Sequence, residues 1–329
     1  MIDPQRWSQE TQFDPLAAEI VREPPGEGDG YWIGAPGVMY DDQDEMFYLV
    51  YRLRRPRGVE PDRGAEIHIA RSRDGIEFET IWKATKDQLN STSIERCAIR
   101  RHADGGWILY VSYVDPADGR WRIDLVKADQ PDRFDLSSVQ PVLTAADIGA
   151  EGVKDPFLFS IGSQWGMIAS YAYASGDASS DQLHGTFDAY NTGLIRSATG
   201  LAFSDDGYNW QWQGQVFGPA ATGWDTYCGR IGSLWRDQNV WMAFYDGSAS
   251  VEENYEERVG LAWSWDLKQF HRLTPEGPLL RPPVPKKALR YFDVLSFPEE
   301  RFIYFEMARP DGSHDLRVIR TPAGSAGTS

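Results

Sequence analysis

The feature that most constrains the fold is a unit of strand and turn patterns that recurs five times along the 329 residues. Each unit opens with a short apolar strand, and an aromatic-rich strand follows after a polar turn. The opening strands are residues 35–40, 94–99, 154–158, 228–232 and 291–295, and the second strands are residues 46–51, 107–113, 165–173, 240–245 and 301–305. Hairpins of this kind bury alternate side chains on each face.

A third strand follows in every unit, over residues 65–70, 121–126, 200–203, 259–263 and 316–319. Three of these strands lead into one turn pattern, at 72–75, 204–207 and 264–267, in which Ser and Asp bond back to the turn backbone. A fourth strand fits in each unit except the last. Residues 18–22 near the N-terminus are predicted to supply the missing strand beside residues 316–319.

Five units of four strands predict an all-β fold, a five-bladed β-propeller with antiparallel blades and a ring closed by the N-terminal strand. The chain is then one domain, 1–329. Its blades cover roughly 31–92, 93–150, 151–224, 225–288 and 289–322, with residues 16–24 closing the ring. The composition agrees with many short strands and turns, since 13% of the residues are aromatic and the chain has 31 Gly and 20 Pro.

Charge and cysteine content restrict the partners. A net charge of −16 argues against nucleic acid or an anionic membrane as a general partner, although a locally basic pocket is allowed. The N-terminal residues lack the basic and apolar segments of a secretory signal, so we expect a soluble, cytoplasmic protein. The two cysteines, Cys97 and Cys228, are far apart in sequence. We therefore expect no metal site, no disulfide framework and no cofactor.

The stretch Lys154-Asp155-Pro156 is the first indication of a site. Proline restricts the residue before it to extended conformations, which would fix the backbone of Asp155 at the mouth end of a buried strand. The alternative is that Asp155 only caps a turn or pairs with Lys154.

In such a propeller the first strands start, and the second strands end, at one mouth of the central channel. The loops from second to third strands lie there too, over residues 54–64, 115–120, 174–192, 247–257 and 309–315. The third loop is long enough to cover the mouth. It is rich in Ser, Asp and Gly, and His184, Phe187 and Tyr190 lie among these polar residues. Loops of this length are either functional lids or merely mobile.

The sequence predicts three catalytic carboxylates at this mouth, Glu95, Asp155 and Asp293, all at strand starts. Substrate-binding residues are predicted at the same level: Trp32, Arg52, Arg96, Lys154, Tyr173, His184, Tyr227, Arg230, Asp246, Arg290 and Tyr291. Converging carboxylates beside aromatic platforms suit glycoside hydrolysis, in which one group protonates the leaving oxygen and another activates water or attacks. The alternative for each charged residue is an ion pair between blades.

The first unit, from Pro36 through Tyr51 and Arg52 to Gly75, resembles the first blade of the five-bladed glycoside hydrolases of families 32, 43 and 130. The stretch 93–96 lies where family 130 has Glu-Asp-Pro-Arg, and 154–156 is similar to the Asp-Pro motifs of families 32 and 43. Two positions depart from these patterns. Gly37 stands where family 43 often has an acid, and Arg96 replaces the family 130 aspartate.

The resemblance to family 43 implies a base on one blade, a modulating aspartate two blades on and a general-acid glutamate three blades on. Counted from the fifth blade, these would correspond to Asp293, Glu95 and Asp155, with the glutamate in the place of the modulator. This resemblance favours a glycosidase that acts with inversion on a short oligosaccharide or glycoside, where Glu95 or Asp155 is the acid and Asp293 the base. The resemblance to family 130 implies instead a phosphorylase, with phosphate held by some of Arg52, Arg96, Lys154, Arg230 and Arg290. A non-catalytic sugar-binding propeller is the third hypothesis. In all three the partner is a small carbohydrate.

Overall fold

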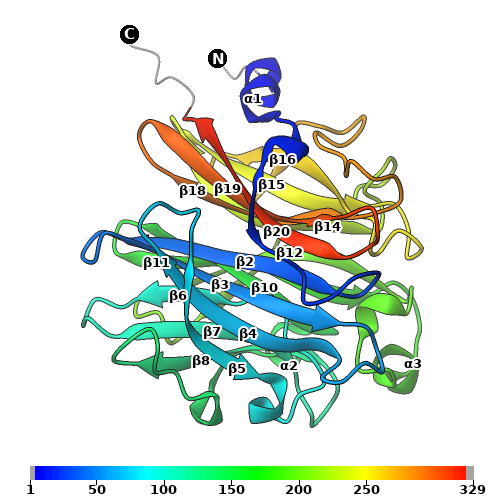
Figure 1. Ribbon diagram of the computed structural model, residues 1–329. Helices are drawn as coiled ribbons and strands as arrows, with labels where there is room; N and C mark the ends of the chain where they lie inside the picture. Colours follow the sequence, from blue (N-terminus) through cyan, green and yellow to red (C-terminus); the bar gives the residue numbers. More distant parts are fainter. Residues whose placement is uncertain (1–3, 324–329) are drawn as a thin grey trace.

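The computed structural model describes residues 4–323, and this part of the chain is built almost entirely of β-strands (Figure 1). Its α-helices are short: α1 (Pro4–Thr11), α2 (Ala145–Ile148) and α3 (Ser180–His184). Single 3₁₀ turns are η1 (Pro15–Ala17), η2 (Lys86–Leu89), η3 (Leu136–Ser138) and η4 (Ala189–Asn191). The predicted all-β class is confirmed.

Antiparallel pairing divides the strands into groups of four, and single parallel bridges, Trp32 with His314 and Ser197 with Cys228, join these groups into two eight-stranded sheets and one four-stranded sheet. The first two groups are β2 (Trp32–Asp41), β3 (Met46–Arg55), β4 (Arg63–Ser72), β5 (Glu79–Thr85), and β6 (Ala98–Arg101), β7 (Trp107–Val114), β8 (Trp121–Ala128), β9 (Gln140–Leu143). The next two are β10 (Gly152–Ile161), β11 (Gln164–Ala174), β12 (Ile195–Ser204), β13 (Gln211–Phe217), and β14 (Cys228–Asp237), β15 (Val240–Ser248), β16 (Arg258–Ser264), β17 (His271–Arg272). The last is β18 (Leu289–Ser296), β19 (Glu300–Ala308), β20 (His314–Pro322) and β1 (Glu19–Arg22).

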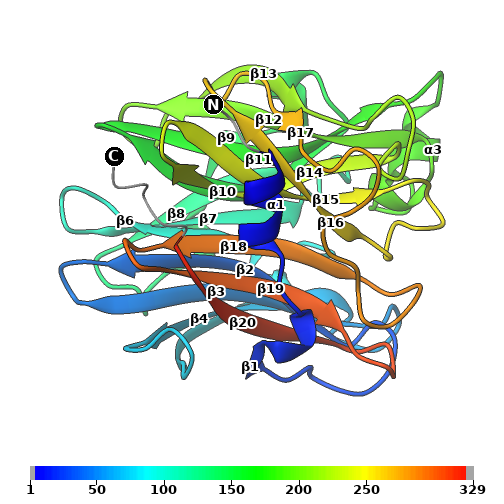
Figure 2. The ribbon, with the colours of Figure 1, turned by 90° about the horizontal axis from the view of Figure 1, so that it is seen from above.

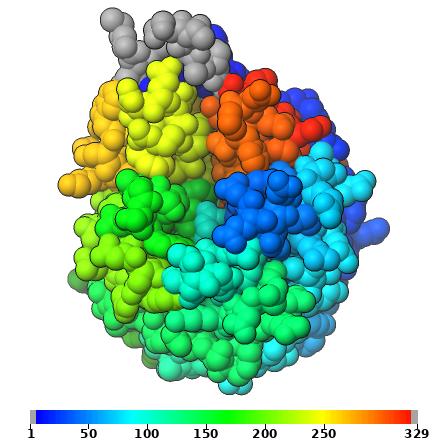
Figure 3. All heavy atoms as spheres, turned by 90° about the vertical axis from the view of Figure 1, so that its left-hand side faces the viewer, coloured from blue at the N-terminus to red at the C-terminus, as the bar shows by residue number. Residues whose placement is uncertain are grey.

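The N-terminal strand β1 pairs antiparallel with β20, where Glu19 lies opposite Val318 and Ile20 opposite Arg317 (Figure 2). The predicted pairing of an N-terminal strand with the last unit is therefore observed. The first strands of the groups contact one another in the order β2, β6, β10, β14, β18 and back to β2. Figure 3 shows the same circular order on the side of the molecule that carries the turns between first and second strands, from blue through cyan, green and yellow to orange.

Neighbouring groups pack face to face through apolar and aromatic side chains. Between the first two groups, Tyr48 lies against Trp107 with ring centroids 4.5 Å apart, and Val50, Ile69 and Leu109 are fully buried in the same cluster. Burying one such aliphatic side chain contributes about 1.5–3 kcal/mol. These interfaces hold the first strands at fixed positions around the central axis.

The three predicted turns form as expected. The Ser72 hydroxyl accepts hydrogen bonds from the backbone N–H groups of Asp74 and Gly75, and Ser204 and Ser264 do the same in their turns. Gly75 has φ 75°, whereas Leu267 takes the same left-handed conformation at φ 66°. Left-handed backbone is unfavourable for a residue with a side chain, so the hydrogen bonds that all three turns share impose this conformation on Leu267.

Most first strands contain an irregularity just inside the pocket end. The register to the second strand shifts between Gly34 and Gly37, Lys154 and Phe157, Ile231 and Ser233, and Arg290 and Asp293. Within these bulges Ala35, Asp155 and Tyr291 have positive φ, of 50°, 59° and 57°. The extended conformation expected for Asp155 before Pro156 is therefore wrong, because the bulge places this residue in the left-handed region. Extra residues of this kind re-aim side chains, and proteins use them next to active sites.

The bulges correct one expectation about the repeat. Glu95, whose N–H donates to the Ser112 carbonyl, precedes the irregular segment of its strand, as Lys154, Arg230 and Arg290 precede theirs. Asp155 lies inside its bulge, and Asp293 follows its bulge. The three predicted acids therefore stand at three different levels of the channel and not at equivalent strand starts.

Within the described residues, no helix is long and apolar enough to cross a bilayer. Cys97 and Cys228 are both buried and free. Burial raises the pKa of each thiol to about 12, so both behave as small apolar side chains near neutral pH.

Candidate active site

A pocket lies at the end of the channel that carries α3 and the long loops, on the right of Figure 1. All five strand groups contribute to its lining, which consists of Trp32, Arg54, Glu95, Trp121, Lys154, Asp188, Tyr190, Asn191, Arg230, Asn254, Tyr255, Glu257, Arg290 and Tyr291. A larger hollow of about 690 Å³ lies beside His102 and Tyr208, among turns at the other end of the groups. That hollow is open and collects residues from neighbouring groups only. We therefore place the site at the channel end.

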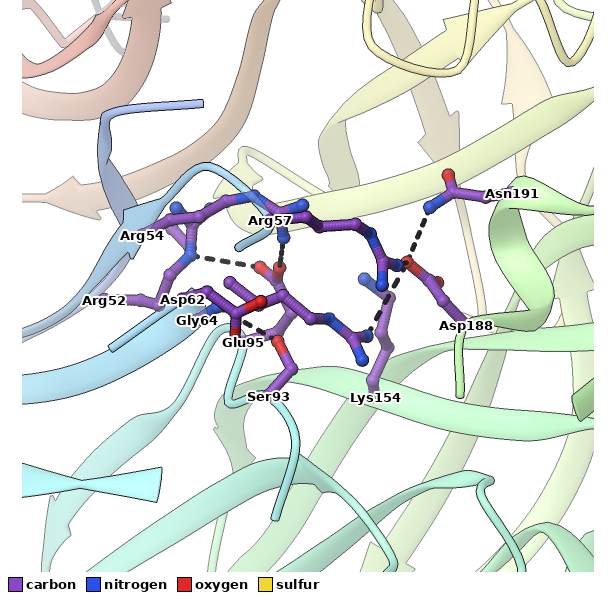
Figure 4. Close-up of polar contacts among 12 residues, drawn as sticks. Arg52, Arg54, Arg57, Asp62, Gly64, Ser93, Glu95, Lys154, Asp188 and Asn191 are labelled. Atoms are coloured by element: carbon purple, nitrogen blue, oxygen red, sulfur yellow. Dashed lines mark hydrogen bonds and ion pairs between the residues drawn. The ribbon is translucent and has the colours of Figure 1, made fainter. Parts of the chain in front are cut away.

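Glu95 is a carboxylate of the lining that arginines and a tyrosine hold in place. Its Oε2 accepts hydrogen bonds from Arg52 Nε at 3.2 Å and from the Tyr291 hydroxyl at 3.3 Å, and Arg54 Nη1 lies 3.7 Å from Oε1. Burial opposes ionisation of this carboxyl, but Arg52, Lys154 and Arg54 together lower its pKa to about 2. Glu95 is therefore an ionised carboxylate near neutral pH and not a proton donor (Figure 4).

Asp155 is held through its backbone and not through its carboxylate. Its N–H donates to the Ser112 hydroxyl at 2.9 Å, whereas neither carboxylate oxygen has a hydrogen-bond partner. Lys154 Nζ lies 3.3 Å away, so the ion pair expected as the alternative does form. The charge of Asp155 raises the pKa of both Tyr190 and Tyr291, two residues of the pocket lining, after the larger effect of burial. Asp155 therefore lies directly behind the lining, at the same end of the channel as Glu95.

Asp293 lies deeper in the channel and does not line the pocket. Its Oδ2 accepts hydrogen bonds from Arg96 Nη2 and from the Val38 N–H. Arg96 also donates to the carbonyls of Pro36 and Gly232, so it connects first strands of four groups across the axis. For Asp293 and Arg96, the alternative of an ion pair between groups is what the structure shows.

A network of arginines and glutamates forms one wall of the pocket. Glu257 accepts hydrogen bonds from Arg230 at 2.7 Å and from Arg290 at 3.2 Å, and Arg290 also bonds Glu306 at 2.8 Å. Arg52 links Glu306 at 3.1 Å to Glu95. Burial works against ionisation of Glu306, but Arg290 and Arg52 hold its pKa well below the usual range. The network fixes the orientation of every side chain in it.

Aromatic rings and cations alternate around the rim. Trp32 stacks on His314 with centroids 4.5 Å apart, and the guanidinium groups of Arg54 and Arg290 both lie 4.8 Å from its ring. On the opposite side, Lys154 Nζ lies 5.0 Å from the Trp121 ring and 4.8 Å from the Tyr190 ring. Such rings provide flat apolar faces on which a sugar can lie.

The loop at 174–192 folds over the mouth, as predicted. Asp188 accepts hydrogen bonds from Arg57 at 3.1 Å and from Asn191 at 2.6 Å, and Asn191 in turn accepts one from Asn254 at 2.7 Å (Figure 4). The space left inside is about 30 Å³, which is room for water and not for a sugar ring. A substrate can enter only after this loop, or the loop that carries Asn254, moves.

The remaining predicted binding residues lie outside the lining. His184 is buried in α3 and pairs with Glu151 at 2.8 Å, and the Tyr227 hydroxyl donates to the Tyr190 carbonyl at 3.2 Å, so both support the loop. Tyr173 packs against Tyr171 at the edge of β11. Asp246 lies behind Tyr291 and accepts a hydrogen bond from the backbone N–H of that residue. Burial raises the pKa of Asp246 to about 7.

Sequence reasoning missed several lining residues as substrate contacts: Arg54, Trp121, Tyr190, Asp188, Asn191, Asn254, Tyr255 and Glu257. Most of them lie in the loops between second and third strands. The sequence predicted at which end of the channel these loops lie, but not where their side chains point. Arg54 could have been found, because it follows Arg52 by two residues on a strand and so lies on the same face. Among residues 4–323, no cluster of three or more His, Cys, Asp or Glu side chains has a geometry that could hold a metal ion.

Comparison with solved structures identifies the fold. A glycoside hydrolase superposes with a TM-score of 0.69 at 13% identity, over 100% of this chain and 98% of the other. A glycosyl hydrolase from Bacteroides ovatus gives 0.62 at 13% identity, over 94% and 93% of the two chains. A β-1,2-mannobiose phosphorylase from Listeria innocua, in complex with β-1,2-mannobiose, gives 0.61 at 14% identity, over 94% and 96%.

This chain has the fold of the β-propeller glycoside hydrolases. The predicted resemblance to that superfamily is thereby confirmed at the level of the fold. No protein-family model matches the sequence, and no curated protein matches it. At 12–14% identity the superpositions carry no residue roles, so the chemistry rests on the geometry of the pocket.

Proposed function

We propose that this chain is a glycoside hydrolase that cleaves a glycosidic bond in a short oligosaccharide or glycoside, on a closed ring of five blades. The circular order of first-strand contacts supports the ring. One observation carries the function. Glu95 and Asp155 come from neighbouring groups at the same end of the channel, both lie close to Tyr291, and aromatic side chains line the pocket beside them.

The two carboxylates are suited to different roles. Glu95 is ionised and fixed by Arg52 and Tyr291, so it suits the group that activates water or stabilises positive charge on the sugar. Asp155 accepts no hydrogen bond on either oxygen, so we assign it the proton transfer to the leaving oxygen. In this role Asp155 first takes up a proton from Lys154 or from water and then donates it. Asp293 is less suitable as the base than the sequence suggested, because Arg96 binds its carboxylate below the pocket.

Carboxylates on neighbouring groups favour an inverting reaction, in which water attacks from the face opposite the leaving group. This arrangement requires carboxyl groups roughly 6.5–9.5 Å apart in the complex with substrate, against about 5–5.5 Å for retention. The anomeric configuration of the first-formed product, followed by NMR, tests the assignment. A product that retains the configuration of the substrate would contradict it.

A glycoside phosphorylase is the second candidate. The basic side chains of the lining, Arg54, Lys154, Arg230 and Arg290, favour it, because arginine forks bind phosphate well. The same assay separates the two. A hydrolase releases free sugar without phosphate, whereas a phosphorylase is inactive until phosphate is added and then forms a sugar phosphate.

The test is a release assay on aryl glycosides and oligosaccharides, with and without phosphate, for the wild type and for Glu95→Gln and Asp155→Asn. We expect each substitution to lower turnover by at least ~10²-fold. Asp124→Asn is the matched control, since Asp124 is also a buried carboxylate but bonds Tyr113 and Arg122 away from the lining. Near-normal turnover of both site variants would refute the assignment. Binding of sugars without any turnover would support a non-catalytic propeller instead.

A further inference from the structure

The pocket is basic in a chain that is strongly acidic. The whole chain has a net charge of −16, yet four basic and three acidic side chains line this pocket. Two arginines, Arg52 and Arg63, and two carboxylates, Asp155 and Glu306, are buried beside it, so the excess of basic over acidic side chains stays at one. An excess of positive charge in a buried site of an acidic protein is costly unless it has a partner.

The basic residues of the lining differ in how far their hydrogen-bonding capacity is used. Arg290 makes four hydrogen bonds, two with Glu306 and two with Glu257, and is fully committed to the wall. Arg230 donates a single hydrogen bond, from Nη2 to Glu257. The side chains of Arg54 and Lys154 donate no hydrogen bond: they have ion pairs, at 3.7 Å to Glu95 and at 3.3 Å to Asp155, and contacts with aromatic rings.

The unused donors are buried. Arg54 is 7% exposed and Arg230 is 6% exposed, and the Nε atom of each is buried without a hydrogen-bond partner. A buried charged donor without a hydrogen-bond partner destabilises the folded protein more than a neutral one does. Since all three side chains line one pocket, one anionic group placed among them would satisfy several donors at once.

Because the site holds a sugar under the function proposed above, we infer that this sugar carries a carboxylate, as in a uronic acid, and that Arg54, Lys154 and Arg230 bind it. The charge count favours this monoanion over a phosphate dianion, since the lining has an excess of one basic side chain. Arg54 and Arg230 can each present two parallel N–H groups to a planar carboxylate. The rings of Trp32 and Trp121 line the same pocket, with Arg54 and Lys154 packed against them.

The decisive measurement compares pairs of aryl glycosides that differ only at C6, a uronide against the corresponding hexoside, for several sugars and both anomers. We expect kcat/KM for one uronide to exceed that of its hexoside by about 10- to 100-fold, the value of one or two charge-assisted hydrogen bonds. A hexoside turned over as well as or better than its uronide would overturn the inference and leave the proposed hydrolase intact.

Variants then locate the contact. Arg54→Gln breaks no hydrogen bond within the protein, so it should fold, and it should reduce the uronide-to-hexoside ratio about 10-fold, mainly through KM. Arg54→Lys keeps the charge without the fork and should recover part of the ratio. The control is Arg71→Gln, because Arg71 pairs with exposed Glu79 away from the pocket and should leave the ratio unchanged. An unchanged ratio in Arg54→Gln and in Lys154→Gln would overturn the assignment of these residues.

Binding in the absence of chemistry separates the two proposals. Free uronic acids, the matching neutral hexoses, inorganic phosphate and sulfate are each titrated against the wild type, and the melting temperature is measured. Stabilisation by a uronic acid alone, without turnover of any glycoside, would support this inference and refute the hydrolase. Stabilisation by inorganic phosphate together with phosphate-dependent turnover would overturn it, since the anion would then be the co-substrate.

Discussion

Two layers of charged residues cross the channel, and they differ in how their hydrogen-bonding groups are used. In the deeper layer, Arg96 donates to Pro36, Gly232 and Asp293, so each of its three guanidinium nitrogens has a partner on a different first strand. In the pocket layer, Asp155 has no hydrogen bond to either oxygen, and Arg54 makes none. Both layers are buried, so solvent exposure does not separate them.

This difference indicates what each layer contributes. A buried ion pair whose groups are all bonded connects strands, and its removal is felt in stability. A buried charge with spare donors or acceptors costs stability and is retained where a ligand completes it. The position of Asp155, in a bulge at φ 59°, agrees with this, since backbone strain of this kind gathers at functional sites.

The largest effect is expected for Asp155→Asn. Turnover should fall by ~10²- to 10⁴-fold because the proton transfer is lost. The melting temperature should fall by only a few degrees: Lys154 loses its ion-pair partner, but no hydrogen bond of the carboxylate is broken and the N–H bond to Ser112 remains. Steady-state kinetics and thermal unfolding of the same preparation measure both. A large loss of stability with normal turnover would place Asp155 in the structural layer.

The reverse pattern is expected for Arg96→Met. Removing the guanidinium leaves Asp293 charged and buried without its partner, which should lower the free energy of unfolding by about 3–5 kcal/mol. Turnover per folded molecule should change by less than about threefold. Urea unfolding and active-site titration measure the two quantities. The double variant Arg96→Met with Asp293→Asn should recover part of the stability, because the unpaired charge is then gone.

A third prediction uses pH. Burial raises the pKa of Asp246 to about 7 from 3.8, so between these values the folded state binds a proton that the unfolded state has released. The contribution to stability is complete below the unfolded pKa and is lost as pH rises through the folded pKa. The free energy of unfolding should therefore fall by up to about 1.4 kcal/mol per pH unit relative to Asp246→Asn, which cannot ionise. Parallel curves for the two proteins from pH 4.5 to 8 would show that Asp246 does not keep its proton.

The sequence predicted the repeat because each strand and turn is specified locally. Alternating apolar residues mark the strands, and the Ser and Asp side chains at 72–74 bond the very turn they occupy. The N-terminal strand was also predictable, since the last unit lacked a partner that residues 19–22 supply. These signals need no knowledge of distant residues.

The site was predicted only in part, because two of its determinants are not local. The bulges shift the register by one position, which brings Lys154, Arg230 and Arg290 into the pocket beside Glu95 and leaves Asp293 below it. Repeat alignment alone treated the three acids as equivalent. The loops bring Asp188 and Glu257 to the rim by contacts such as Arg57 with Asp188, across 131 residues of sequence. Such contacts follow from the fold and not from the residues nearby.

The smallest effect is expected from the loop at 174–192, which has both a buried apolar part and a polar part at the pocket. Leu183 and Tyr190 are buried with Val114 and Trp121, so shortening the loop would remove part of the core and lower the melting temperature.

A point substitution is the cleaner test. Asp188→Asn weakens the ties to Arg57, which is half-exposed, and to Arg63 at 3.7 Å, without removing packed surface. The pair with Arg57 is partly exposed and worth about 0–1 kcal/mol, but Asp188 and Arg63 are both buried, so we expect the melting temperature to fall slightly. Opening of the loop should become easier, which we expect to alter kcat and KM by about two- to fivefold, with the larger change in whichever step depends on loop movement. Glu79→Gln, which breaks the exposed pair with Arg71 away from the pocket, is the matched control. If Asp188→Asn matches this control in both constants, the loop closes the pocket without regulating access to it.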